Sequence, residues 1–199
     1  MSLNAVLKRR PKLISQGFVL AMALIVVAIS PRPVRAQNEG GTSFKATLTV
    51  QFIATQICAT GDASCSTCVN QNGYYVEAQG IADTSMGPLF VLLFKCYNPY
   101  DGPFGTYAGT LTTTAPNGKD SLTWAYSGRN DNGGDFYGFG PFSGTLTITA
   151  GTGNFAGAHG SASFTAASGP SFTAGPVPIQ QEGTAFYYVH GQLELPGGN

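Results

Sequence analysis

The chain has 199 residues, of which 43% are hydrophobic and 10% charged, and its ten basic and ten acidic residues cancel. Six of the ten basic residues lie in residues 1–36, which contain no acid, so residues 37–199 hold four basic against ten acidic residues and a net charge of −6. Nucleic-acid binding needs a basic track, and the four remaining cations are too few and too scattered to form one. We therefore expect no nucleic-acid partner.

The first 36 residues have the pattern of a signal peptide. An apolar run from Phe18 to Ile29 follows a basic segment, and Val34-Arg35-Ala36 fits the small-residue cleavage rule. A helix of that length rises about 18 Å against roughly 30 Å of hydrocarbon, so an uncleaved anchor is the lesser alternative. We expect cleavage after Ala36, a single domain over 37–199, a secreted location (periplasmic or extracellular) and no membrane span after cleavage.

Eight segments after the leader have the period-2 alternation of half-buried strands, and helical periodicity is absent there. The predicted strands run from about Ser43 to Ala54, Tyr74 to Ala82, Leu89 to Tyr97, Thr106 to Ala115, Ser121 to Gly128, Phe142 to Ala150, Ala158 to Ala167 and Thr184 to Leu195. An Asn-Gly pair at Asn117-Gly118 predicts a hairpin between the fourth and fifth.

These strands predict an all-β fold, an eight-stranded antiparallel barrel, with a β-sandwich as the alternative. Eight strands of this length can close around a lumen that side chains fill or that holds one small ligand. The third strand, from Leu89 to Phe94, is apolar on both faces. We expect one face to line the lumen and the other to be covered by a loop, a terminus or another subunit.

Four cysteines in an exported chain predict disulfides. Cys68 lies just before the second strand and Cys96 at the end of the third, its hairpin partner, which favours Cys68–Cys96 and leaves Cys58 with Cys65. A zinc site is the alternative, because Cys65-x-x-Cys68 has ligand spacing, but a second such pair is absent from the sequence. We expect no metal and no cofactor.

The hairpin from Phe142 to Ala166 contains a glycine-rich reversal. Gly151, Gly153 and Gly157 bracket Phe155, and glycine permits positive φ and close backbone approach. A phosphate-binding loop would have to begin a helix, whereas a strand follows here. The glycines are therefore interpreted as geometric and Phe155 as a plug for the barrel end.

The segment GTLTITAGTGNFAGAHGSASFTA, from Gly144 to Ala166, resembles a hairpin of bacterial secreted proteins related to the allene oxide cyclase and dirigent barrels. The stretch from Gly109 to Gly128 resembles the preceding hairpin of the same group. This resemblance implies a calycin-type eight-stranded barrel and a homo-oligomer, a trimer in plant relatives. It brings no active site, because the acids and arginines of dirigent proteins have no counterpart that we can assign, and Arg129 is the single arginine after the leader.

Polar candidates for chemistry are few. Glu77 and Lys95 interrupt apolar strands and are candidates for a pair across the hairpin, while His190 shares a strand face with Phe186, Tyr188 and Glu194. We take Glu77, Lys95 and His190 as catalytic candidates for a lumenal site. A lone histidine without a placed partner, such as His159, is more often structural.

The polar loop after the fifth strand leads into aromatic residues. It begins at Arg129 and contains Phe136, Tyr137 and Phe139, and these four are candidate ligand-binding residues. A long loop at a barrel mouth is suited to a lid over a ligand, and the alternative is that its aromatic side chains only cap the core.

The sequence favours a non-enzymatic secreted barrel that binds a small apolar ligand or has a surface or assembly role. The alternative is an isomerase or cyclase that shapes an apolar substrate in the lumen. A wide lumen with convergent polar groups would favour an enzyme. A lumen packed solid with Phe and Leu would count against both ligand binding and catalysis and would favour the assembly role.

Overall fold

The computed structural model describes residues 41–101, 105–131, 141–168, 172–174 and 180–196. Most of these residues lie in antiparallel strands, and the two helices are short. The strands are β1 (Thr42–Thr55), β2 (Tyr74–Thr84), β3 (Gly87–Asn98), β4 (Thr106–Thr114), β5 (Ser121–Asn130), β6 (Pro141–Thr152), β7 (His159–Ser168), β8 (Phe172–Ala174) and β9 (Gln180–Glu194). The helices are α1 (Ala63–Asn70) and a 3-10 turn over Gly153–Phe155.

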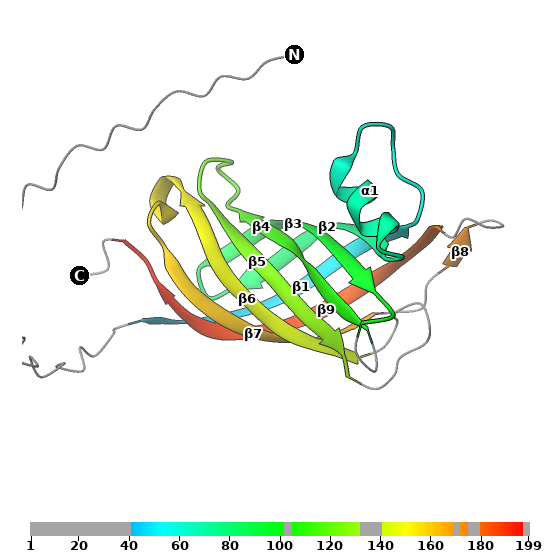
Figure 1. The fold of residues 1–199 in the computed structure, drawn as a ribbon. Coiled ribbons are helices and arrows are strands. Elements are labelled where there is room, and N and C mark those ends of the chain that lie inside the picture. The colour runs from blue at the N-terminus through cyan, green and yellow to red at the C-terminus, as the bar shows by residue number, and fades with distance from the viewer. Residues whose placement is uncertain (1–40, 102–104, 132–140, 169–171, 175–179, 197–199) are drawn as a thin grey trace, which may run out of the picture. The chain divides into compact units, whose positions relative to one another are not determined.

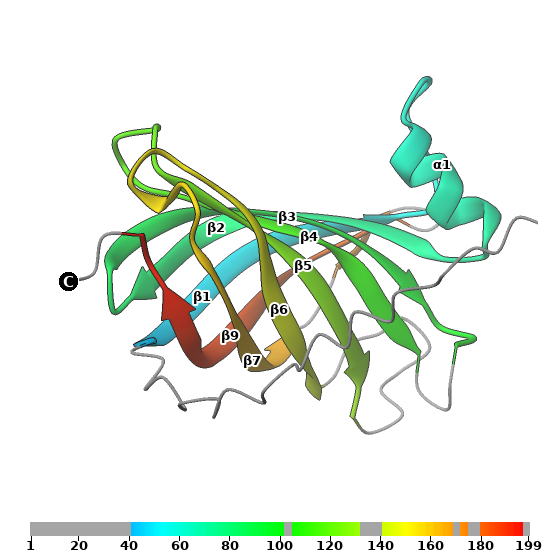
Figure 2. The same cartoon turned by 60° about the vertical axis from the view of Figure 1, so that its left-hand side comes forward.

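Eight of these strands close into a barrel. Each pairs antiparallel with its neighbour in the order β1-β2-β3-β4-β5-β6-β7-β9, and β9 returns to pair with β1 from Thr42↔Leu193 to Thr55↔Gln180. Figures 1 and 2 show the strands curling round to meet. The three-residue β8 is an addition that pairs with β9 outside this circle. The β1–β9 pairing confirms the barrel and excludes the sandwich, because a sandwich would leave two separate sheets.

Alternation along the strands places one face of each in the lumen. In β1, buried and exposed residues alternate from Phe44 to Ala54, as the sequence predicts. Phe164 fills much of the lumen. The centres of the Phe164 and Tyr126 rings are 4.8 Å apart, and the rings are stacked. A Cβ added at Gly144 would lie 2.7 Å from the Phe164 ring. The glycine therefore makes room for the aromatic ring that fills the core.

The outer face of β3 is apolar and exposed. Phe90 is 57% and Leu92 44% exposed, and no described segment covers them. Ile81, paired with Phe90 across the hairpin, is exposed beside them, and Ile53 on β1 is exposed on the same outer face, where it pairs with Glu77. We refer to Ile53, Ile81, Phe90 and Leu92 as the outer apolar patch. A covering loop or terminus is not found among the described residues, and a cover by another subunit, the third possibility that the sequence suggested, stays a prediction.

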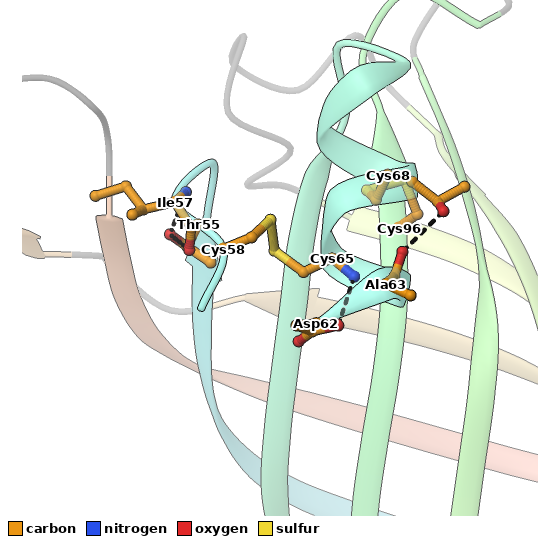
Figure 3. Close-up of a disulfide and its surroundings, with 9 residues drawn as sticks. Thr55, Ile57, Cys58, Asp62, Ala63, Cys65, Cys68 and Cys96 are labelled. Atoms are coloured by element: carbon orange, nitrogen blue, oxygen red, sulfur yellow. Dashed lines mark hydrogen bonds between the residues drawn. A yellow bond between two sulfur atoms is a disulfide. The ribbon is translucent and has the colours of Figure 1, made fainter. Parts of the chain in front are cut away.

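The cysteines form the two disulfides expected, Cys58–Cys65 and Cys68–Cys96 (Figure 3). Oxidised sulfur does not ligate zinc, so the alternative zinc site is excluded. The helix α1 that carries Cys65 and Cys68 was not expected. It begins at Asp62, whose carboxylate accepts a hydrogen bond from the Cys65 N–H at 2.9 Å, the usual role of an N-cap residue.

Helix α1 is hard to recognise in the sequence, because it has only eight residues and lacks a strong apolar stripe. The helix is held against the barrel by the disulfides and by Tyr75 and Phe94, which face outward at this end. Of the part of the chain that the structure describes, no helix is long and apolar enough to cross a membrane.

The glycine-rich reversal between β6 and β7 has the geometric role predicted for it. Gly153 and Gly157 have φ values of 57° and 84°, a region that favours glycine. Phe155 between them packs, partly buried, against the core, and β7 rather than a helix follows. These features identify the reversal as a closure of the barrel end opposite α1.

Candidate functional site

Lys95 lies inside the barrel. Its side chain is on the lumenal face of β3 between Leu93 and Tyr97, and the residue is 6% exposed. The pairing partners of Lys95 are Val76 on β2 and Gly109 on β4. A Cβ at Gly109 would lie 2.8 Å from the Lys95 Cβ, so the glycine leaves the space in which the lysine stem runs.

Aromatic rings surround the amine. The Lys95 Nζ lies 4.1 Å from the ring centre of Tyr107, 4.6 Å from Phe142, 5.3 Å from Tyr126 and 6.0 Å from Tyr187. The negative face of such rings attracts a cation by about 0.5 to 2 kcal/mol each, more where water is excluded. The rings therefore offset part of the cost of burying a charge.

The amine has no carboxylate partner among the described residues. The two ion pairs found there are Arg129–Asp131 and His159–Glu194. Lys95 donates one long hydrogen bond, 3.4 Å, to the Tyr187 hydroxyl. Burial lowers the pKa of Lys95 to about 7. Since a buried lysine is usually paired, this unpaired amine is a candidate functional group.

Two phenols near Lys95 are also buried. Burial raises the pKa of both Tyr126 and Tyr187 above the usual value for tyrosine, so both hydroxyls stay neutral and able to donate hydrogen bonds. The two hydroxyls are also close enough to influence each other's pKa.

An asparagine fixes the tyrosines at this end of the lumen. Asn130, 1% exposed at the end of β5, accepts a hydrogen bond from the Tyr107 hydroxyl at 2.9 Å and donates one to the Tyr97 hydroxyl at 3.2 Å. The rings of Tyr97 and Tyr107 stack at 4.7 Å. Hydrogen bonding and stacking together hold the Tyr107 ring beneath the amine.

A small cavity adjoins these groups. The pocket lies at the α1 end of the lumen. The empty space between its atoms is about 450 Å³, a volume that includes space open to solvent. A water molecule fits in only about 30 Å³ of it. That is space for about two water molecules. Its polar lining includes Lys95, Tyr97, Tyr107 and Tyr187, and its apolar lining includes Val50, Phe52, Ala54, Val76 and Ala185.

The other lumenal candidates lie elsewhere. Glu77 and Lys95 are on opposite faces of the hairpin, because Glu77 pairs with Phe94 and Lys95 with Val76, so the suggested Glu77–Lys95 pair is wrong. Glu77 is exposed on the outside. His190 is also exposed outside, opposite Lys45 and Ser163. The alternation of β2 and β9 turns both side chains away from the lumen.

The candidate ligand-binding loop is only partly described. Arg129 points outward from β5, its side chain 76% exposed and 4.0 Å from the Asp131 carboxylate. Phe136, Tyr137 and Phe139 lie outside the described residues. His159 is exposed and forms a 2.7 Å contact with the Glu194 carboxylate. In the ranges that the structure describes, no three His, Cys, Asp or Glu side chains gather as metal ligands would.

Most of the residues around Lys95 were not expected from the sequence. Tyr97 is two positions after Lys95, Tyr107 pairs with Tyr97, and Tyr126 and Asn130 share a face of β5. The strand alternation was the available signal, because it assigns these tyrosine and asparagine side chains, which end in polar groups, to the lumenal face. This alternation alone does not distinguish a tyrosine that only packs in the core from one whose hydroxyl lines a site.

Comparison with known proteins assigns no family to the chain. No protein-family model and no curated protein matches the chain. A solved structure similar to it is that of a pterocarpan synthase dirigent protein, with a TM-score of 0.40 and 11% identity over 78% of this chain and 93% of that one. At that identity no residue role is carried across.

Proposed function

We propose that this barrel is a non-enzymatic binding protein that holds the polar end of a small, mainly apolar ligand at Lys95. The observation that carries the proposal is the buried amine, which has an aromatic surround and a tyrosine hydroxyl but no carboxylate among the described residues. A ligand with an anionic or hydrogen-bond-accepting end would supply the missing partner.

An apolar tail on the ligand would meet an apolar lining. Beyond the amine its lining is aliphatic and aromatic, from Val50 and Phe52 on β1 to Val76 on β2. The water-sized space of about 30 Å³ suits a polar head of two or three non-hydrogen atoms, and a tail would extend along these residues towards the α1 end. An isomerase or cyclase substrate needs more enclosed space, so we favour binding over catalysis.

A series of straight-chain carboxylates tests this proposal. Acetate, butyrate and hexanoate are titrated into protein labelled with ¹⁵N at lysine Nζ, and the Lys95 signal is followed by NMR. Each methylene buried contributes about 0.8 kcal/mol, roughly fourfold in Kd, so affinity should rise along the series. Hexanol, which lacks the charge, should bind more weakly than hexanoate.

Two variants serve as matched controls. Lys95→Met should abolish the preference for hexanoate over hexanol, whereas Lys45→Met, on the exposed face of β1, should not change it. Equal hexanoate binding by wild type and Lys95→Met would place the site elsewhere, and no binding by any of the acids would reject the proposal.

We also propose export of the protein. Two disulfides are compatible with an oxidising compartment, and residues 1–36 have the pattern of a cleaved leader. Amino-terminal sequencing of the protein recovered outside the cytoplasm tests this, with Gln37 expected as the first residue. Membership of the allene oxide cyclase and dirigent-like group is part of the same proposal and rests on the hairpin from Gly144 to Ala166.

The outer apolar patch favours a second role, self-association. Its four exposed side chains on β1, β2 and β3 are unusual for a surface that stays in water, and the hairpin resemblance implies a trimer. In sedimentation experiments wild type should be oligomeric and Phe90→Ser should be a smaller species. Tyr188→Ser, which alters an exposed aromatic ring on β9, should match wild type. A monomeric wild type would reject this role.

A further inference from the structure

We propose that Lys95 is a nucleophile that captures a small aldehyde as a Schiff base inside the barrel. The inference rests on the proposed function, because it places the polar end of a ligand at Nζ. It goes further in two ways: the ligand is a small carbonyl compound, and the bond to Nζ is covalent. It stands on an amine within the lumen, a cavity at its tip and a neutral phenol beside it.

The surroundings favour the reactive, uncharged form of the amine. A lysine becomes nucleophilic when an apolar environment removes water from it and no anion holds its proton. Among the residues that the structure describes, the side chains facing Nζ come from β4, β5, β6 and β9, and they are Tyr107, Tyr126, Phe142 and Tyr187, none of them acidic. Glu77, Asp83 and Glu182, on strands β2 and β9, are exposed to solvent.

The pKa of about 7 that burial gives Lys95 makes about half of the molecules uncharged at neutral pH. An ordinary lysine, with a pKa near 10.4, is uncharged in roughly one molecule per few thousand at the same pH. At neutral pH the uncharged, reactive fraction of Lys95 is therefore much larger than that of a surface lysine.

The step is balanced without a further reactant. The Nζ lone pair attacks the carbonyl carbon, an N–C bond forms, and the carbonyl oxygen takes up the proton released from nitrogen to give a carbinolamine. The C–O bond then breaks, the hydroxyl leaves as water with the second proton from nitrogen, and a C=N bond remains. Tyr187, whose oxygen lies 3.4 Å from Nζ, is placed to donate a hydrogen bond to the departing oxygen.

The cavity sets the size of the carbonyl compound. Space for about two waters beside the amine matches formaldehyde or acetaldehyde, and a longer aldehyde requires its chain to lie along Phe52 and Val76. We therefore expect acetaldehyde to react faster than benzaldehyde, whose ring would have to displace the aromatic side chains around Nζ.

Native mass spectrometry with acetaldehyde at pH 7 tests the capture. Wild type should gain one adduct with the mass of acetaldehyde less one water. Lys95→Arg, which keeps the cation but removes the nucleophile, should lose the adduct, and Lys45→Arg should keep it. An adduct that persists in Lys95→Arg would overturn the proposal.

A second measurement uses only wild type, so that a folding defect in a variant does not decide the result. Cyanoborohydride reduction followed by peptide mapping compares Lys95 with Lys45 and Lys119, both exposed. We expect Lys95 to be alkylated at least about tenfold faster, given its larger uncharged fraction. Equal or slower alkylation of Lys95 would overturn the inference, while binding of hexanoate at Lys95 without capture would leave the proposed function standing.

Discussion

The Lys95 amine lies 4.1 Å from the centre of the Tyr107 ring, and the pairing of β3 with β4 fixes this relationship. Lys95 pairs with Gly109 and Tyr97 with Tyr107, so the lysine and the ring are diagonal neighbours on one face of the sheet. Asn130 holds the other end of the ring through the Tyr107 hydroxyl. The amine is thus positioned by the barrel itself, before any ligand arrives.

This burial predicts an unusual dependence of stability on pH. Between about pH 7 and pH 10 the unfolded chain keeps a proton on Lys95 that the folded protein has lost, so the free energy of unfolding should rise with pH. Above about pH 10 it should fall, because tyrosines ionise in the unfolded chain while Tyr126 and Tyr187 resist ionisation in the fold. Urea unfolding across pH 6 to 11 measures both limbs.

The variant Lys95→Met should remove the rising limb and keep the falling one. At pH 7 it should also stabilise the fold, by up to about 4 kcal/mol if the gain is like that seen when buried ion pairs are replaced by well-packed apolar side chains. Lys45→Met is the control and should keep both limbs. A Lys95→Met profile parallel to wild type would show that the amine is solvated in the folded protein.

The hydrogen bonds of Asn130 predict both a stability and a site effect. Asn130→Ala removes the partners of the Tyr97 and Tyr107 hydroxyls at this position, and we expect a loss of about 1 to 3 kcal/mol in urea unfolding. The Lys95 Nζ signal should shift as the Tyr107 ring moves. Asn70→Ala, at the exposed end of α1, should change neither quantity by a comparable amount.

The two disulfides should differ in their contributions. Cys68–Cys96 closes 28 residues and Cys58–Cys65 closes 7, and the chain-entropy model assigns about 3 to 4 kcal/mol to the first loop and about 2 to 2.5 kcal/mol to the second. The double variant Cys68→Ser with Cys96→Ser should therefore unfold at lower urea than Cys58→Ser with Cys65→Ser. The reverse order would indicate that α1 contributes little to the barrel.

The fold could be predicted because strand alternation is local. The alternation of apolar and polar residues is recognisable within about ten residues for each of the eight barrel strands. The disulfide pairing followed from the positions of Cys68 and Cys96 at the ends of one hairpin. Helix α1 was missed because eight residues held mainly by disulfides and a capping aspartate need no amphipathic stripe. The small β8 was missed for a related reason, since three residues cannot show a period.

The site was less accessible to sequence reasoning. Lys95 was recognised as a polar interruption, but Glu77 was taken for its partner because the two lie on paired strands. Their actual register, Glu77↔Phe94 and Lys95↔Val76, is one residue away from a direct pair, and a shift of one residue moves a side chain to the other face. The tyrosines could not be assigned to the amine because cation–π contacts depend on ring orientation, which no strand period specifies.

The end of the barrel opposite α1 is fixed by Asp120, and this predicts an acid-sensitive closure. Its carboxylate accepts hydrogen bonds from the Asn154 N–H at 2.9 Å, from the Asn154 side-chain amide at 2.9 Å and from Asn117 at 2.8 Å. These donors, the Asn154 N–H foremost, lower the pKa of Asp120. The stabilisation is therefore complete above the ordinary carboxyl range near pH 3.9 and is lost as pH falls through the lowered value.

Hydrogen exchange at the Asn154 amide measures this closure directly. We expect Asp120→Ala to speed exchange there at pH 7 and to release Phe155, which packs against the core beside it. Wild type should approach the variant's rate, corrected for intrinsic exchange, only under strongly acidic conditions, where Asp120 takes up its proton. Asp83→Ala, an exposed carboxylate on β2, should leave Asn154 protected, and so should Lys95→Met at the other end of the lumen. Unchanged protection in Asp120→Ala would mean that the glycine-rich reversal is held by Phe155 alone.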